Sequence, residues 1–107
     1  MNVINLTPHA IHIMPEGPDG PVRTIESTGF ARAKTERTKI GDIDGIPVFR
    51  TVFGNVEGLP DPQPETVYIV SALTAQAVPH RDDVFIPDDA VRDEQGRVIG
   101  CRALGRI

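Results

Sequence analysis

The chain contains no tryptophan, a single tyrosine and a single cysteine, Cys101. One cysteine cannot form a disulfide within the chain, which favours a reducing, cytoplasmic setting. No apolar run approaches the roughly 18 residues that a membrane-spanning helix needs. The first residues also lack the charged and apolar regions of a signal peptide. We therefore expect neither membrane insertion nor secretion.

Aromatic residues make up only 5% of the sequence, so the core must be built from aliphatic side chains. The 107 residues are the usual size of one domain, and we expect a single globular domain over 1–107. Hydrophobic residues at 39% and charged residues at 24% fit a globular chain. The net charge of −4 argues against binding to nucleic acid or to an anionic membrane, which requires a basic surface.

Short β-branched and alternating segments, separated by glycine and proline, predict many strands joined by turns. We expect the fold to be mainly β: a compact antiparallel sheet, a sandwich or a partly open barrel with one short helix. The apolar run 67–70 predicts a buried central strand, and Pro87 is expected to stop the strand before it. The expected strands are 3–6, 10–14, 22–25, 30–39, 46–56, 67–70, 83–86, 90–92 and 97–104.

Residues 72–77 predict the one short helix, and Pro79 is expected to end it. Ser71 stands where an N-cap residue would stand. A serine between an apolar strand and a helix is also the position of a nucleophile in many hydrolases, but the glycines that flank such a serine are missing. We therefore interpret Ser71 as a cap.

Five carboxylates and two guanidinium groups fall within residues 81–93. Three interpretations are open: turns in which aspartate and arginine fix the backbone, a site for an anionic ligand, or a small hydrolase that uses the aspartates with or without a divalent metal. The residues are Arg81, Asp82, Asp83, Asp88, Asp89, Arg92 and Asp93.

A local basic stripe lies within residues 32–39 of this acidic chain. On a strand, Arg32 and Lys34 project to the same face and could hold a phosphate or a nucleotide. The alternative is a solvated edge strand, because lysine and arginine prevent edge-to-edge pairing of sheets. The other two basic residues of the stripe are Arg37 and Lys39.

The three histidines, His9, His12 and His80, raise the question of a metal site. His9 and His12 are three positions apart and do not share a face on a strand, and no zinc-ligand spacing surrounds them. We interpret the three as a turn, a strand and a loop residue, and we expect no cofactor.

Several segments resemble a family of small uncharacterised proteins found in bacteria, phages and prophages, whose members begin with the motif Ile-Asn-Leu-Thr-Pro-His. The resemblance covers most of the chain and implies no established activity, so no catalytic residue is carried over. It implies an accessory factor that binds a host protein or a small signalling molecule. The matching segments are 4–9, 44–48, 53–54, 59–60, 68–71, 81–84, 87, 92–93 and 96–97.

The leading hypothesis is therefore a non-enzymatic binding protein for a small anionic, nucleotide-like ligand or for a protein partner, acting as a homo-oligomer. The competing hypotheses are the hydrolase proposed above for residues 81–93 and a structural or assembly protein. Its subunit contacts would be made by exposed strand edges and by the proline-rich connector, residues 58–65. The expected ligand-binding residues are Arg81, Asp82, Asp83, Arg92, Asp93, Arg32 and Lys34.

Overall fold

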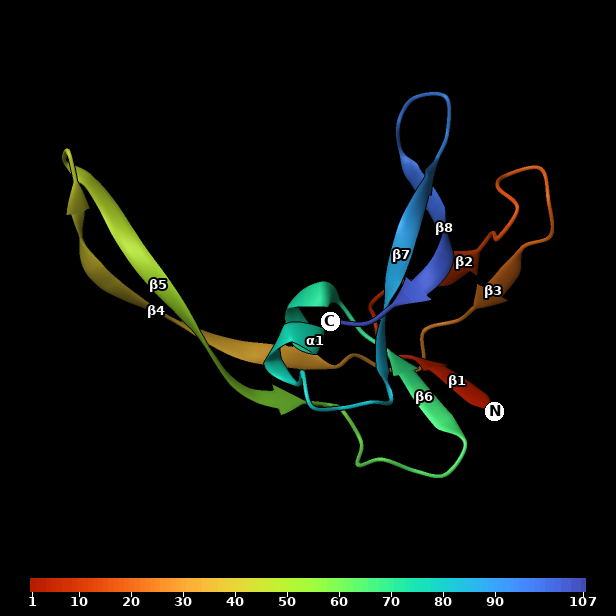
Figure 1. Ribbon diagram of the computed structural model, residues 1–107, viewed down its shortest axis with the longest axis horizontal. Coiled ribbons are helices and arrows are strands. Elements are labelled where there is room, and N and C mark those ends of the chain that lie inside the picture. Colours follow the sequence, from red (N-terminus) through yellow and green to blue (C-terminus); the bar gives the residue numbers. More distant parts are fainter.

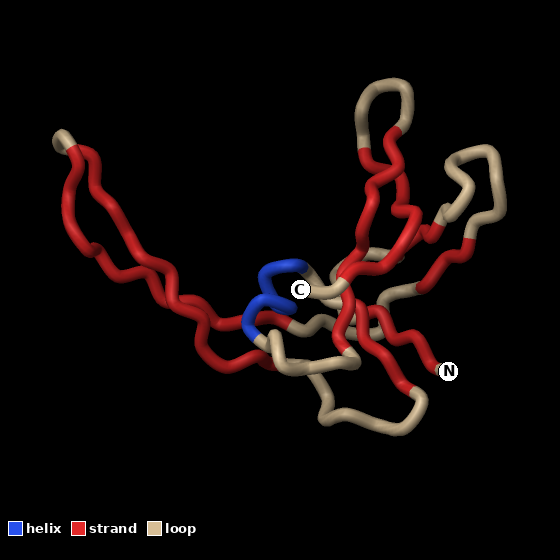
Figure 2. The backbone as a smooth tube through the Cα atoms, in the orientation of Figure 1, coloured by secondary structure: helices blue, strands red, loops and turns tan.

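The computed structural model describes all 107 residues and confirms the mainly β fold (Figure 1). Eight strands and one six-residue helix, α1 (Ala72–Ala77), follow one another along the chain. Strands dominate the backbone trace, and the helix is its one short helical segment (Figure 2). The strands form a six-stranded sheet and a separate two-stranded ribbon.

The six-stranded sheet is nearly closed into a barrel. Its outer strands meet where Asn5, at the end of β1, bridges Ser27, and the Thr28 amide donates to the Asn5 carbonyl at 3.0 Å. Closure of this kind leaves few sheet edges open to solvent. In spatial order the strands are β1 (Asn2–Asn5), β6 (Thr66–Ile69), β7 (Val84–Arg92), β8 (Val98–Gly105), β2 (Ile11–Ile13) and β3 (Arg23–Ile25).

Among the predicted alternatives the sheet matches the partly open barrel, but its strands are mixed in direction and not all antiparallel. β6 runs parallel to β1 and to β7, and β2 runs parallel to β8. The helix α1 is the crossover between β6 and β7, because parallel strands cannot be joined by a tight turn. A crossover with a helix of only two turns leaves little trace in the hydrophobic pattern.

Ser71 caps α1, as its position predicts. Its side chain accepts a hydrogen bond from the Thr74 amide at 3.3 Å, which satisfies one of the free amides of the first turn. Thr74 and Ala75 are the buried residues of the helix. The Thr74 hydroxyl also donates to the Ala31 carbonyl at 3.4 Å, so α1 is tied to the chain entering β4.

The core lies around β6, which confirms the predicted buried strand at residues 67–70. Tyr68, Ile69 and Val70 are almost completely buried. Tyr68 and Val70 pack on one side of the sheet, and Ile69 packs on the other with Ile11 and Cys101. Alternate residues of a strand face opposite sides, so this single strand contributes to both clusters.

Strand β7 continues through Pro87, and the prediction that Pro87 stops it is wrong. The first residues of β7 pair with β6, up to Phe85, and the pairing with β8 begins at Ile86. Pro87 therefore stands where β7 has lost its neighbour on the β6 side, and its missing N–H costs no ladder bond there. The predicted strands 83–86 and 90–92 are consequently one strand.

The two-stranded ribbon, residues 32–57, extends away from the sheet and is called the arm below (Figure 1). It consists of β4 (Arg32–Ile43) and β5 (Ile46–Glu57), paired along their whole length with two irregularities. The two-residue turn Asp44-Gly45 has positive φ at both positions, as a type I′ hairpin requires. At about 3.3 Å per residue, twelve residues make the arm roughly 40 Å long.

No helix of the chain has the length and apolar character to cross a bilayer.

Candidate functional site

Arg81 and Asp83, two of the predicted ligand-binding residues, bind each other. The guanidinium donates to both carboxylate oxygens at 2.8 Å, and Arg81 Nη2 also donates to the Pro60 carbonyl at 2.9 Å. Their side chains are only 14% and 16% exposed. The hydrogen bonds from Arg81 lower the pKa of Asp83. The pair therefore joins the proline-rich connector to the start of β7.

Asp82 faces away from this pair. Its carboxylate is 92% exposed and accepts a hydrogen bond from Arg106 Nη2 at 3.0 Å, near the end of the chain. Asp82 and Asp83 are therefore neighbours in sequence that do not form one site.

Arg92 and Asp93 lie at the opposite end of β7, roughly 30 Å from Arg81 at the strand rise of about 3.3 Å per residue. Asp93 accepts bonds from the backbone amides of Gln95 and Arg97 at 2.9 and 3.0 Å, and these amides contribute to lowering its pKa. Arg92 donates to the Gly96 carbonyl at 2.7 Å. Both side chains thus shape the turn between β7 and β8.

Arg32 and Lys34 lie at the root of the arm. Lys34 forms an ion pair of 2.9 Å with Glu57 of β5, and this hydrogen bond lowers the pKa of Glu57. Arg32 stands directly opposite Glu57 in the ladder. The seven predicted binding residues therefore occupy three separate places: both ends of β7 and the arm.

The aspartates that the hydrolase hypothesis needs do not converge. Asp82 and Asp83 are engaged with different arginines, and Asp88 and Asp89 are exposed further along β7. No three His, Cys, Asp or Glu side chains are grouped so as to hold a metal ion.

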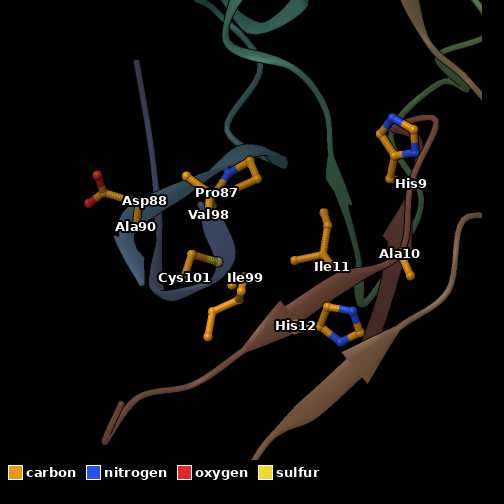
Figure 3. Close-up of a pocket in the computed structure, with 11 residues that line it drawn as sticks. His9, Ala10, Ile11, His12, Pro87, Asp88, Ala90, Val98, Ile99 and Cys101 are labelled. Atoms are coloured by element: carbon orange, nitrogen blue, oxygen red, sulfur yellow. The ribbon is translucent and has the colours of Figure 1, made fainter. Parts of the chain in front are cut away.

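A cavity of about 420 Å³ opens between β2 and the β7–β8 hairpin (Figure 3). This volume is within the range of about 300–1,000 Å³ that is usual for ligand pockets. Its lining is mainly apolar, with Ile11 directed from β2 toward the β8 side (Figure 3). The lining residues are His9, Ala10, Ile11, His12, Pro87, Asp88, Ala90, Val98, Ile99, Gly100 and Cys101.

The cavity exists because β2 and β8 are paired at one position only, Ile13 with Cys101. Before that point the two strands diverge. At the junction Gly100 lies so close to β2 that a Cβ atom there would be 2.6 Å from the His12 carbonyl oxygen. Burial raises the pKa of the Cys101 thiol in the cavity wall. The sequence pattern gave no signal for this site, because its two sides are about 90 residues apart in the chain.

Two of the three histidines line this cavity. His9 lies in the segment before β2, with its ring directed away from Ile99 and Cys101, and His12 is the middle residue of β2 (Figure 3). The His12 Nδ1 atom is 3.0 Å from the Thr24 hydroxyl of β3. Asp88 stands on the opposite side, and its carboxylate is directed away from β2 (Figure 3). The cavity thus has an apolar interior with polar groups at its margins.

The second unusual surface is the arm, which leaves six large apolar side chains between 37% and 67% exposed. Both faces of the ribbon carry them. Ile43 and Ile46 oppose each other at the tip, while Phe49 and Phe53 lie on the other face with Arg37, whose guanidinium carbon is 4.2 Å from the Phe49 ring centre. The remaining two are Ile40 and Val52.

Comparison of the chain with family models, with curated proteins and with solved structures gave no match. No residue role is therefore transferred from another protein. The cavity and the arm stand out on geometry alone, the cavity by its volume and mainly apolar lining and the arm by its exposed apolar side chains.

Proposed function

We propose that this chain is a non-enzymatic protein-binding module that assembles with other copies of itself through the β4–β5 arm. The single supporting observation is the exposed apolar surface of the arm. The proposal combines the protein-partner and assembly hypotheses drawn from the sequence. A role as a cytoplasmic accessory factor of phage or prophage origin fits the family resemblance and is part of the proposal.

A free two-stranded ribbon is marginally stable in water, because stability requires a third strand or packing against another element. Only the root of the arm, near Ala31, is tied to α1. The outer arm has no other element of its own chain against it (Figure 1). A hairpin with twelve residues in each strand is thus long enough to need a partner that covers it.

The amount of exposed apolar surface also favours a partner. Large apolar residues have surfaces of about 150–250 Å² each, so the six leave on the order of 500 Å² in contact with water. These side chains lie on both faces of a ribbon that no other element covers, and the largest single apolar patch on a typical monomer measures about 300–600 Å². A stable interface buries about 800 Å² on each partner, which the arm with its backbone and polar residues can supply.

Charge favours a second copy as the partner. Residues 32–57 contain five basic and four acidic residues, whereas the rest of the chain contains six basic and eleven acidic ones. The arm is therefore slightly positive and the sheet clearly negative. Complementary surfaces of this kind favour contact between the arm of one copy and the sheet of another.

The small-ligand hypothesis receives less support, because Arg81, Lys34 and Arg92 are already engaged within the chain. The hydrolase hypothesis receives less support because its aspartates are separated. Neither hypothesis explains the exposed apolar surface of the arm.

The test is the mass of the full chain in solution, measured by light scattering from about 1 to about 100 µM. We expect species of at least twice the monomer mass, whose share rises with concentration. A chain that stays monomeric throughout this range contradicts the proposal.

The matched variant removes the outer arm and keeps its root. Glu36 and Val52 stand opposite each other, so replacing residues 37–51 by Asn-Gly closes a shorter hairpin in the same register. This variant should keep the circular dichroism spectrum of a folded β protein and become monomeric. Assembly equal to that of the full chain would show that the arm is not the binding element.

A further inference from the structure

We propose that the tip of the arm of one copy enters the cavity between β2 and β7–β8 of a second copy. The inference rests on the proposed function and specifies its contact. The tip consists of Ile43, the turn Asp44-Gly45 and Ile46, and the cavity is the one lined by residues of β2, β7 and β8.

The two surfaces agree in size and chemistry. At about 30 Å³ per water molecule, a cavity of 420 Å³ would otherwise hold about 14 waters against a mainly apolar wall. Ile43 and Ile46 are the most exposed apolar residues of the arm, at 67% and 63%, and they project side by side from the same face. The tip thus presents two aliphatic side chains to a space that can hold both.

The polar groups also correspond. Asp44, in the turn, takes part in no ion pair within its own chain. On the cavity side, His9 and His12 each carry an imidazole that can donate an N–H hydrogen bond to a carboxylate at the margin of the cavity. The acidic turn therefore meets the side of the cavity that has hydrogen-bond donors.

A second pairing is available at the opposite margin. Arg50 lies four residues after Ile46 on the same face of β5, and it forms no ion pair within its chain. Asp88 lines the cavity, is exposed and is likewise without an ion pair. With the tip in the cavity, Arg50 is available to pair with the Asp88 carboxylate at its margin.

The occupant must be a different copy, because the chain cannot reach its own cavity. The arm extends along the longest axis, which measures 51 Å, with the tip at one end and β2, β7 and β8 toward the other (Figure 1). Each copy then offers one tip and one cavity. Such a head-to-tail contact leads to a ring or to an open chain of copies, not to a symmetric pair alone.

The experiment is a disulfide cross-link between tip and cavity. Val98 lines the cavity and is exposed, so the variant I46C/V98C/C101A carries one new thiol on each of the two surfaces and no other. Copper phenanthroline, a mild oxidant, joins two thiols only where they approach each other. We expect a ladder of dimers, trimers and larger species on a non-reducing gel, which collapses to monomer on reduction.

The controls are I46C/C101A and V98C/C101A, each with a single thiol, and neither should give more than traces of dimer. If I46C/C101A alone gives strong dimers, the tips of two arms meet each other, and the cavity proposal is wrong while assembly through the arm stands. If the triple variant assembles but forms no cross-link, the cavity proposal is again wrong, while assembly through the arm stands. A monomeric full chain overturns both proposals.

A charge exchange tests the contact in a background that keeps Cys101. R50E and D88K, both at exposed positions, should each weaken self-association at least fivefold. The double variant R50E/D88K should recover most of this loss, because the two charges face each other again with exchanged signs. If the double variant self-associates as weakly as the single variants, or if D88K alone has no effect, the proposed binding of the arm tip in the cavity is wrong.

Discussion

Arg81 donates two parallel hydrogen bonds to Asp83, both of 2.8 Å, across a single intervening residue. The third bond of the guanidinium, to the Pro60 carbonyl, fixes a connector that is otherwise free of regular structure. The loss of one partner of such a charged pair lowers stability most where both side chains are shielded from water, as they are here.

The first prediction concerns the loss of this pair. Arg81→Ala leaves the Asp83 carboxylate shielded and unpaired, so the free energy of unfolding should fall by about 2–3 kcal/mol. Arg106→Ala is the matched control, because Arg106 pairs with the exposed Asp82 and should change stability by less than about 0.5 kcal/mol. Urea denaturation of both variants measures the difference. Equal effects would mean that the Arg81–Asp83 pair carries no special stability.

The second prediction is a pH dependence from Asp83. Its pKa is lower in the folded chain than in the unfolded one, since Arg81 stabilises the charged form. The resulting stability is complete above the unfolded value of about 4 and is lost as the pH falls through the folded pKa. Between neutral pH and about pH 3, the wild type should therefore lose more stability than Asp83→Asn. Parallel curves for the two proteins would contradict this assignment.

The third prediction concerns Asn5, which is completely buried. Its amide nitrogen donates to the carbonyls of His9 and Ile25 at 2.8 and 2.9 Å, and its oxygen accepts from the amide and the hydroxyl of Thr7. Asn5→Ala leaves these groups without partners and should cost about 2–4 kcal/mol by urea denaturation.

The matched control for Asn5 is Asn55→Ala, at an exposed position of the arm, with an expected change of less than about 0.5 kcal/mol. A small effect of Asn5→Ala would show that water replaces the lost bonds. Because Asn5 joins the two outer strands of the sheet, its loss should also increase hydrogen exchange at the Thr28 amide.

The fourth prediction concerns the junction of β2 and β8. A Cβ atom at Gly100 would lie 2.6 Å from the His12 carbonyl oxygen and 3.0 Å from the sulfur of Met14. Gly100→Ala should therefore push the strands apart, cost about 2–3 kcal/mol and increase hydrogen exchange at the Met14 amide, which donates to Cys101.

Gly54→Ala provides the control for Gly100, because its Cβ would make only ordinary contacts of 3.5 and 3.6 Å with Lys34. A change of less than about 1 kcal/mol is expected there. If both glycine variants behave alike, the close approach of β2 and β8 does not limit stability.

The local elements were predictable because their causes are local. The apolar run ending at Val70, the cap at Ser71 and the turn residues near Asp93 each determine structure within a few positions. The continuation of β7 through Pro87 was not predictable, because it depends on which neighbour the strand has lost at that point.

The candidate site was beyond sequence reasoning for a related reason. The cavity arises from the divergence of β2 from β8, a relation between distant segments that no motif encodes. The composition of residues 81–93 suggested a ligand site, whereas most of those side chains shape turns and loops. The arm was predicted as two strands, but nothing in its pattern indicated that both faces stay exposed.

The pairing of β1 with β6 sets an order of events during synthesis. Asn2 lies opposite Thr66, 64 positions later, so β1 cannot pair with β6 until that residue has been made. At about 5–20 residues per second, the ribosome needs roughly 3–13 s to reach it. The two strands of the arm, by contrast, are neighbours in the chain, and their hairpin can close within microseconds of emergence, although it is only marginally stable until it is covered. Its apolar tip is therefore available to an older copy while the newer copy is still completing its own sheet.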